Sequence, residues 1–575
     1  MQKRWLVKTP VESTTLEEFR STLKVDRIVA ELLMQRGITS FEDAETFFRP
    51  KLDQLHNPFL MKDLKKAVER VNLAIAKGEK ILLFGDYDVD GTTAVALLYG
   101  FLIEKHQNLD YYIPDRYSEG YGISMQGIDF AAENDFKLII SLDCGIRSVE
   151  HVKYAQEKGI DFIICDHHNP GDTVPDCIVL DPKQKDCDYP YKELSGCGVG
   201  FKLLHGLCLE NDWKQSELFN QLDLLAVSIG ADIVPVTGEN RVLCYHGMML
   251  LNAKPRPAFV ELLRIAKREF PVTLTDVVFT IAPRINAAGR LRSGKHAVEL
   301  MISDNVADIR RLAAAIDEDN KERRQLDQVI TSEALELIEQ NADYENRKTT
   351  VVFKNDWHKG VVGIVASRLI EKHYRPTIVL TESNGKATGS ARTVNDFDIH
   401  AALVKCEHLL EQFGGHTHAA GMTMALENVT AFQEHFEKVV QESITIEDET
   451  PEQEVDIEID FNEIFTNGEN RMKIPRIKRI LEQFEPHGPG NMKPVFLAKN
   501  VYSTDVRLLK DVHLKLSMTQ PNSDVVIEGI GFNLGDKIDD VAAGVPFDLV
   551  FTMESNKWNN RETLQLNIKD IRSVL

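Results

Sequence analysis

The most constraining feature of the chain is the stretch 80–93, which reads K-I-L-L-F-G-D-Y-D-V-D-G-T-T. Its apolar run, residues 81–84, is typical of a buried strand. Three carboxylates follow at alternate positions: Asp86, Asp88 and Asp90. Residues 92–99 then have the composition of a helix that a threonine caps. A strand, an acidic turn and a helix in this order predict an open α/β sheet, in which ligands bind beyond the carboxyl ends of the strands.

Three carboxylates this close together repel one another, and a divalent cation such as Mg²⁺ or Mn²⁺ would offset the repulsion. Three alternatives remain for this stretch alone. An EF-hand loop would need a glutamate where Leu97 stands. A haloacid dehalogenase phosphatase would place its nucleophile directly after the strand, whereas Asp88 comes three residues after Gly85. The third alternative is an acidic turn that faces solvent.

The first half of the chain continues to alternate between strand and helix patterns. The expected strands are residues 110–113, 137–142, 162–165 and 178–180, and the expected helices are residues 124–134 and 148–158. This βαβ rhythm predicts a parallel, doubly wound sheet.

Three of the apolar strands stop at or just before an acid: Asp86, Asp143 and Asp166. In a parallel sheet these acids lie on one edge. A single aspartate at a strand end is usually a cap or turn residue. Three of them, with His167 and His168 directly after the last, favour a metal site. Adjacent side chains point in different directions, so we expect one imidazole on a metal and the other on a phosphate or a second metal.

Three motifs carry a resemblance to a known family: D-Y-D-V-D-G at residues 86–91, L-D-C-G at 142–145 and D-H-H at 166–168. On these motifs the chain resembles the DHH phosphoesterase superfamily, and within it the RecJ-type single-strand-specific DNA exonucleases. A fourth motif of that superfamily is matched by S-I-G-A-D-I-V-P at 228–235, which contains Asp232.

The resemblance implies a set of metal ligands: Asp88, Asp90, Asp143, His167, His168 and Asp232. Asp143 would bridge two ions, and His167 would also stabilise charge on the phosphorus. Asp86 would be a catalytic group that faces the phosphate or supports a ligand. By strand-end position alone, Asp181 is a better candidate than Asp232.

Two further regions are candidates for substrate binding. In A-P-R-I-N-A-A-G-R-L, residues 282–291, small residues let the backbone approach a ligand and Arg284 can hold a phosphate, with Asn286 beside it. A polar turn with a surface arginine is the alternative. The runs 389–392 and 413–421 combine small residues with polar side chains and predict a phosphate cradle. Its expected members are Ser390, Arg392, Gly414, Gly415 and His416. Both of these runs resemble the DHH-associated domain, which implies that they hold a 5′ phosphate.

The chain divides into five predicted regions. These are a helical cover at 1–50, a DHH catalytic domain at 51–260, a helical connector at 261–345, a DHH-associated α/β domain at 346–445, and an OB-fold-like nucleic-acid-binding domain at 450–575. We expect the cover to pack on the catalytic domain. A long helix over 304–340 should join the two α/β lobes, and short alternating β runs after the acidic segment 443–458 favour the OB-like barrel.

The composition of the whole chain limits its possible partners and location. Lys and Arg minus Asp and Glu is 67 − 89 = −22, which argues against an undirected nucleic-acid binder but allows basic residues gathered in one groove. No apolar run reaches the ~18 residues of a membrane span, and no signal peptide is visible. The eight cysteines form no C-x-x-C pair, which favours reduced thiols and a cytoplasmic location.

The resemblance implies a 5′-to-3′ exonuclease that hydrolyses single-stranded DNA to mononucleotides with two Mn²⁺ or Mg²⁺ ions, in DNA repair and recombination. The expected partners are single-stranded DNA, a helicase and a single-stranded-DNA-binding protein, with no membrane and a monomeric enzyme. Two alternatives stay open: a phosphodiesterase for short oligonucleotides or cyclic dinucleotides, and a non-catalytic replication scaffold.

Overall fold

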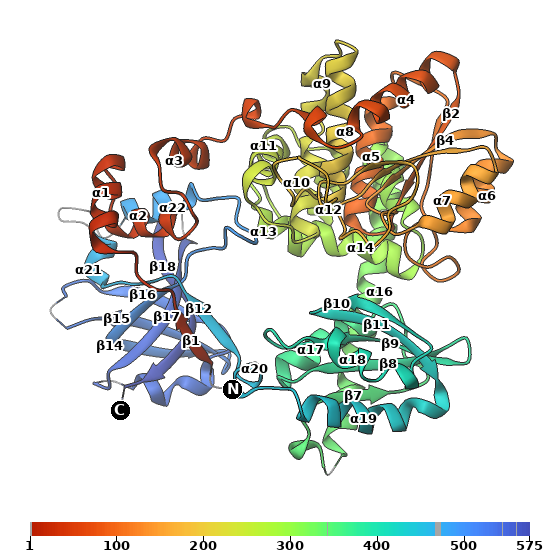
Figure 1. Cartoon of the computed structure of the whole chain (residues 1–575). Helices are drawn as coiled ribbons and strands as arrows, with labels where there is room; N and C mark the ends of the chain where they lie inside the picture. The colour runs from red at the N-terminus through yellow and green to blue at the C-terminus, as the bar shows by residue number, and fades with distance from the viewer. Residues whose placement is uncertain are drawn as a thin grey trace. The chain divides into compact units, whose positions relative to one another are not determined.

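The computed structural model describes residues 3–341, 343–465, 473–521, 523–542, 544–558 and 561–574. The chain forms two compact units. The large unit comprises Val7–Asp317 and Val455–Leu575, and the small unit comprises Glu318–Glu454 with the chain up to Leu6. Both are visible in Figure 1, and each is described by itself.

A five-stranded parallel sheet forms the centre of the large unit, in the order β3-β2-β4-β5-β6. Its strands are β2 (Lys80–Gly85), β3 (Leu109–Tyr112), β4 (Phe136–Leu142), β5 (Asp161–Cys165) and β6 (Ile178–Leu180). The predicted α/β class with a parallel sheet is therefore confirmed.

Helices cover both faces of this sheet, which is why its strands are apolar at successive positions. Ile81 and Leu83 of β2 pack toward one helical layer, and Leu82 and Phe84 pack toward the other. The first layer contains α4 (Leu64–Lys77), α5 (Val89–Leu102) and α8 (Gly196–Glu210). The second contains α6 (Met125–Glu133) and α7 (Val149–Glu157).

A helical region completes the α/β part of the large unit. Its elements are α9 (Gln215–Phe219), α10 (Leu222–Ala231), α11 (Gly238–Ala253), α12 (Pro257–Ile265), α13 (Leu274–Asp276), the π-helix η3 (Val277–Ile281), α14 (Ala282–Leu291) and α15 (Lys295–Ile302). The predicted long helix is α16 (Val306–Glu339). Its beginning packs into the core of the large unit through Ile309 and Ile316, and its end packs into the core of the small unit through Ile330 and Ala334.

The C-terminal part of the large unit is a closed β-barrel. Its strands are β13 (Ile457–Glu458), β14 (Phe496–Leu509), β15 (His513–Thr519), β16 (Ile527–Gly531), β17 (Phe547–Trp558) and β18 (Arg561–Ser573). The sheet order is β13-β14-β15-β16-β18-β17, and an additional pairing of β14 with β17 closes it. The predicted OB-like domain is confirmed in type.

The N-terminal helices are α1 (Ser13–Leu23), α2 (Arg27–Met34) and α3 (Phe41–Phe48). Their apolar residues, among them Phe19 and Leu32, share one core with barrel residues such as Phe496. The carbonyl of Phe47 also accepts two hydrogen bonds from Arg241 of α11, so the expectation that this cover packs on the catalytic domain holds only in part, because its buried apolar residues pack with the barrel. An amphipathic helix pattern predicts that one face is buried, but it does not identify the partner, which here lies more than 400 residues away in the sequence.

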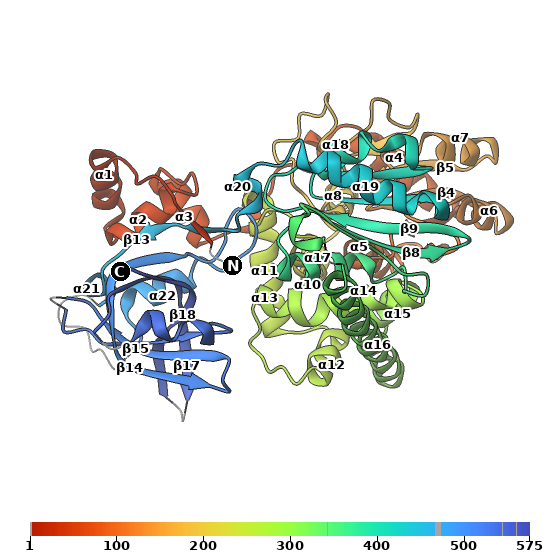
Figure 2. The ribbon, with the colours of Figure 1, turned by 90° about the horizontal axis from the view of Figure 1, so that it is seen from below.

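The small unit is an α/β lobe with the sheet order β10-β11-β9-β8-β7, in which only β7 and β8 run parallel. Its strands are β7 (Thr350–Phe353), β8 (Thr377–Ser383), β9 (Lys386–Arg392), β10 (Gln412–His416) and β11 (Ala419–Ala425). Helix α17 (Val362–Lys372) covers one face, and α18 (Ile399–Val404) with α19 (Val429–Gln441) covers the other, as Figure 2 shows.

Two features of the described residues complete the fold. A two-stranded sheet of β1 (Arg4–Val7) and β12 (Glu452–Val455), which the sequence did not predict, pairs distant parts of the chain. None of the helices in the described ranges combines the length and the apolar character that a bilayer crossing needs.

Candidate metal centre

The three acids that follow strands lie at one edge of the parallel sheet. The backbone N–H of Asp86 donates to the carbonyl of Leu142 at 3.4 Å, and that of Asp143 donates to Cys165 at 2.9 Å. The backbone N–H of Asp166 donates in the same way to the carbonyl of Leu180, the last residue of β6. Each acid is thus tied to the neighbouring strand, and all three are buried.

The ligand atoms of seven side chains converge at this edge. They form three groups in which all atoms lie within 4.8 Å of one another: Asp143, His167 and His168; Asp90, His167 and Asp232; and Asp86, Asp88 and Asp143. The Nε2 atom of His167 lies 3.2 Å from Oδ1 of Asp143 and 3.5 Å from Oδ2 of Asp232. The structure therefore brings together all six predicted metal ligands and adds Asp86 to them.

Among the residues that the structure describes, several buried polar atoms of this cluster have no hydrogen-bond partner. They are both carboxylate oxygens of Asp86, Oδ1 of Asp143, Oδ2 of Asp232 and both ring nitrogens of His167. Buried polar atoms are normally paired, so each unpaired one calls for an explanation such as an ion. Carboxylate oxygens with imidazole suit hard divalent cations such as Mg²⁺ and Mn²⁺. The residues present therefore fit a divalent metal site.

Electrostatics supports the same conclusion. Burial, reinforced by neighbouring carboxylates, raises the pKa of Asp86 and Asp143 well above the ordinary value and that of Asp232 to about 9. A bound cation would remove this penalty because it stabilises the charged carboxylates. Burial lowers the pKa of His167, so its ring is neutral and available as a ligand.

Asp90 has a second, structural task. Its carboxylate accepts hydrogen bonds from the backbone N–H groups of Gly196 at 2.7 Å and Cys197 at 2.9 Å, at the start of α8. The hydroxyl of Ser228 donates to it at 2.6 Å. Asp90 therefore fixes α8 and α10 to the acidic turn while it faces the cluster.

Asp166 holds His168 in place. Its Oδ1 lies 2.7 Å from Nδ1 of His168, and because a carboxylate only accepts, the imidazole N–H donates. Burial raises the pKa of Asp166, but the hydrogen bond and charge of His168, the backbone N–H of Ile146 and the charge of His167 together outweigh burial and lower the pKa to about 2. The pKa of His168 is correspondingly raised to about 9 although burial opposes this. The sequence pattern counted Asp166 among the strand-end acids that favour a metal site, but it did not indicate that Asp166 positions His168.

Tyr121 was also missed. Its hydroxyl lies 3.1 Å from Nε2 of His168, and its ring meets that of Tyr87 edge to face at 6.2 Å. No motif in the sequence marked this tyrosine, because it comes from the loop between β3 and α6.

Arg284 and Asn286 lie on α14, which packs against the acidic turn. A Cβ added to Gly289 of this helix would come within 2.3 Å of the carbonyl oxygen of Tyr87. Arg284 pairs through Nε with Oδ1 of Asp317 at 2.9 Å. Asn286 is half-buried on the same helix. Both predicted substrate-binding residues therefore belong to the large unit, with the metal cluster.

The predicted phosphate cradle is assembled within the small unit. Ser390 of β9 is paired with Gly421, which in turn is paired with Gly414 of β10. Arg392 and His416 occupy the corresponding row two residues along, with Ala419 between them. Because residues two apart on a strand share a face, these side chains project from one face of the sheet.

Close packing surrounds this face. Arg392 donates through Nη1 to the hydroxyl of Ser390 at 2.7 Å, and burial lowers its pKa. A Cβ at Gly363, in the first turn of α17, would lie 2.9 Å from Nη2 of Arg392. Gly415 has φ +151°, and a Cβ there would lie 2.3 Å from the carbonyl oxygen of Ala419. The sheet therefore requires glycine at this position.

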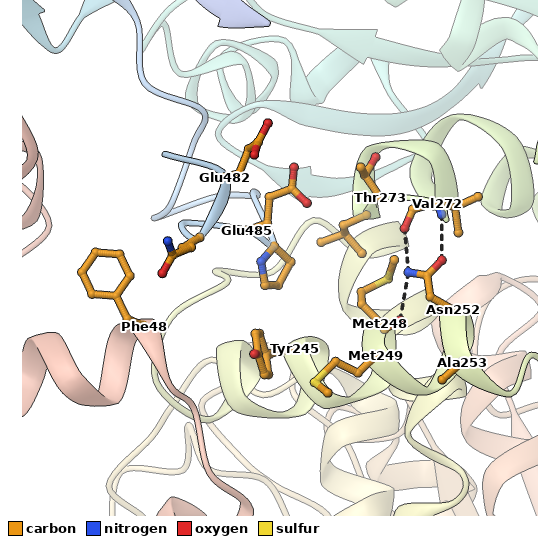
Figure 3. Close-up of a pocket in the computed structure, with 13 residues that line it drawn as sticks. Phe48, Tyr245, Met248, Met249, Asn252, Ala253, Val272, Thr273, Glu482 and Glu485 are labelled. Atoms are coloured by element: carbon orange, nitrogen blue, oxygen red, sulfur yellow. Dashed lines mark hydrogen bonds between the residues drawn. The ribbon is translucent and has the colours of Figure 1, made fainter. Parts of the chain in front are cut away.

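A separate cavity of about 610 Å³ lies in the large unit, away from these groups (Figure 3). Its wall includes Tyr245, Met248 and Glu485, and the Asn252 amide exchanges two hydrogen bonds with the backbone of Val272, at 2.7 and 2.9 Å. None of the predicted site residues lines it. The position of this cavity therefore gives no reason to place the catalytic site in it.

Three family models match the chain. The DHH family N-terminal domain matches residues 80–229, the DHHA1 domain matches residues 346–442, and the RecJ OB domain matches residues 469–570.

The relatives that match nearly the whole chain share one description. The chain is 37% identical over 571 residues to the single-stranded-DNA-specific exonuclease RecJ of Bacillus subtilis, which covers 99% of this chain and 70% of that protein. It is 30% identical to RecJ of Escherichia coli, with 95% of both chains covered. Among solved structures, RecJ of Thermus thermophilus in complex with Mn²⁺ superposes with a TM-score of 0.83 at 27% identity, covering 99% of this chain and 79% of that one. The same protein in complex with Mg²⁺ gives a TM-score of 0.78.

Proposed function

The chain belongs to the RecJ family of single-stranded-DNA-specific exonucleases, and from that premise we propose that its large unit hydrolyses single-stranded DNA at the acidic edge of the parallel sheet. The observation that carries the proposal is the convergence of seven ligand side chains, several with buried atoms that lack a partner. Like its Thermus relative, the enzyme uses Mn²⁺ or Mg²⁺.

Six side chains would hold two ions: Asp88, Asp90, Asp143, His167, His168 and Asp232. Asp143 and His167 each belong to two of the three ligand groups, which supports Asp143 as the ligand that the ions share. When bound, the ions would lower the pKa of a water molecule and polarise the phosphoryl oxygens.

The chain's own groups prepare this site. The hydrogen bond from Nδ1 of His168 to Asp166 leaves Nε2 as the ring nitrogen available for a ligand role, and a bound cation would displace the proton that the raised pKa of His168 otherwise keeps there. The neutral ring of His167 can act as a ligand, and it stabilises the charge that develops on the phosphate. Asp86 faces the scissile phosphate from the same edge and supports the ligands on either side of it.

The polarity of digestion would come from the small unit. Ser390, Arg392 and His416 project from one face of its sheet, and the glycines of β10 bring backbone close to that face. Arginine and exposed N–H groups are the usual partners of a phosphate. We assign this face to the 5′ phosphate, so that digestion runs 5′ to 3′ and releases mononucleotides.

The remaining assignments follow from the substrate. An enzyme that cuts only unpaired strands needs a helicase and a single-stranded-DNA-binding protein to supply them, as DNA repair and recombination do. The eight free thiols support a reducing, cytoplasmic setting, and we assign a monomer as the active form. The complete ligand set argues against a non-catalytic scaffold. The β-barrel argues against an enzyme that acts on cyclic dinucleotides.

A two-label digestion tests the proposal. Single strands labelled at the 5′ or the 3′ end are incubated with the protein and Mn²⁺, with a blunt duplex as control. The wild type should release the 5′ label first as a mononucleotide and leave the duplex intact. The Asp143→Ala variant should bind the strand and cleave nothing. Retained cleavage by that variant would refute the metal assignment, and release of the 3′ label first would refute the polarity.

A further inference from the structure

We propose that Ile233 and Phe279 form an apolar contact for the bases of the single strand beside the metal centre. The proposal rests on the proposed function and adds to it two residues that contact the bases. Both side chains belong to the large unit, and both are large and apolar although they are exposed to solvent.

Ile233 combines exposure with backbone strain. It directly follows Asp232, a ligand in the cluster, and its side chain is 67% exposed. Its φ is +60°, in the left-handed region that a β-branched residue adopts only rarely and at a cost. Glycine or asparagine would remove that cost, and a polar residue would suit the exposure. Strain of this kind persists mostly where it serves function.

Phe279 is exposed in a similar way. It lies in the middle of the π-helix η3 and is 75% exposed, while Val277 and Ile281 of the same turn are buried. Single-turn π-helices are rare and often occur at functional sites. The widened turn leads directly into α14, where Arg284 donates through Nη1 to the carbonyl of Thr280 at 2.7 Å.

The two segments that carry these residues touch. A Cβ added to Gly230, in the last turn of α10, would lie 2.7 Å from Cδ1 of Leu274 and 3.3 Å from Cγ2 of Val278. The end of α10, with Asp232 and Ile233, therefore packs against the start of η3. One segment supplies a metal ligand and the other leads to the Arg284 helix, so both apolar side chains belong to segments that border the proposed reaction site.

Nucleic-acid bases are the occupant that this setting suits. A strand whose phosphate lies among the ligands has its bases only a few ångströms away, and every base offers a flat, weakly polar face. Stacking of aromatic side chains on bases is favourable for all sequences, as a nuclease that digests any strand requires. An anionic or strongly polar ligand would gain nothing from an isoleucine and a phenylalanine.

The experiment compares steady-state kinetics on two 5′-phosphorylated substrates of equal length, one with normal bases and one with abasic sites near the 5′ end. Phe279→Ala should raise KM on the normal strand about fivefold or more, with little change in kcat, and should have no effect on the abasic strand. Ile233→Gly should also raise KM on the normal strand, yet raise the unfolding temperature because the strain is relieved.

Two matched controls separate this from general effects. Phe41→Ala removes another phenylalanine, 52% exposed, from the N-terminal helices. Lys267→Gly relieves another positive φ, of 56°, in the large unit. Both should leave KM unchanged. An unchanged KM in Phe279→Ala, or an equal rise on the abasic strand, would overturn the proposal while the wild type still digests DNA. If the wild type itself digests no DNA, the proposed function fails instead.

Discussion

Replacing Asp232 by asparagine should make the metal-free protein more stable. Burial and neighbouring carboxylates raise the pKa of this side chain to about 9, against about 3.9 in an unfolded chain. Between these values the folded protein binds a proton that the unfolded chain releases, so stability falls as the pH rises from about 4 toward 9. At about 1.36 kcal/mol per pH unit, the penalty reaches about 4 kcal/mol at pH 7. Asparagine does not titrate, so the variant does not lose stability in this way.

About 4 kcal/mol is an upper limit, because neighbouring carboxylates can take up part of the proton that Asp232 gives up. At pH 5 the same arithmetic leaves only about 1.5 kcal/mol. The large unit has 311 + 121 = 432 residues, so 1 kcal/mol corresponds to about 1 °C and the variant should unfold at most about 4–5 °C above the wild type at pH 7. Adding Mn²⁺ should stabilise the wild type more than the variant, which has lost a ligand.

The assay is thermal unfolding in chelator and in Mn²⁺ between pH 5 and pH 8. Asp223→Asn, at the other end of α10, is the matched control. Asp223 is buried and pairs with Arg256 at 2.8 and 3.0 Å, so its replacement should lower stability by about 3 kcal/mol whether Mn²⁺ is present or not. An Asp232→Asn protein no more stable than the wild type without metal at pH 7, or a difference that does not narrow toward pH 5, would refute the reasoning.

Two glycine pairs give further predictions. Gly196→Ala should abolish cleavage, because its Cβ would lie 2.5 Å from the side chain of Asp143, whereas Gly198→Ala, with its nearest contacts at 3.4 Å, should remain active in the same digestion assay. Gly415→Ala should destabilise the small unit and weaken 5′-end binding, because φ is +151° and a carbonyl oxygen lies 2.3 Å from the added carbon. Gly414→Ala, whose added carbon has nothing within 4 Å, should leave the stability of the small unit unchanged, and thermal unfolding of the two variants checks this.

Local patterns predicted much of the fold. Continuous apolar runs followed by acids identified β2, β4 and β5 and placed Asp86, Asp143 and Asp166 at one sheet edge, because parallel strands end at the same edge whatever connects them. The long polar-faced pattern identified α16 within two residues at its beginning and one at its end.

Other site residues carried no local signal. Asp232 alone reads as a helix-end acid, and only resemblance to a family singled it out. Tyr121 reaches His168 from a loop with no periodicity. Nothing in the sequence near Asp90 shows that its carboxylate also holds the start of α8, a contact between residues more than 100 positions apart.

Periodicity, turn residues and side-chain type are local properties, so they were enough to predict most of the strands and helices and the residues with metal-binding chemistry. What those segments pack against depends on the fold of the whole chain. It placed α1–α3 on the barrel and Asp232 beside His167, and it left Ile233 strained and exposed next to the acidic cluster. Burial against a particular partner is a property of the whole chain, since many apolar faces could satisfy the same helix and only their joint packing selects one.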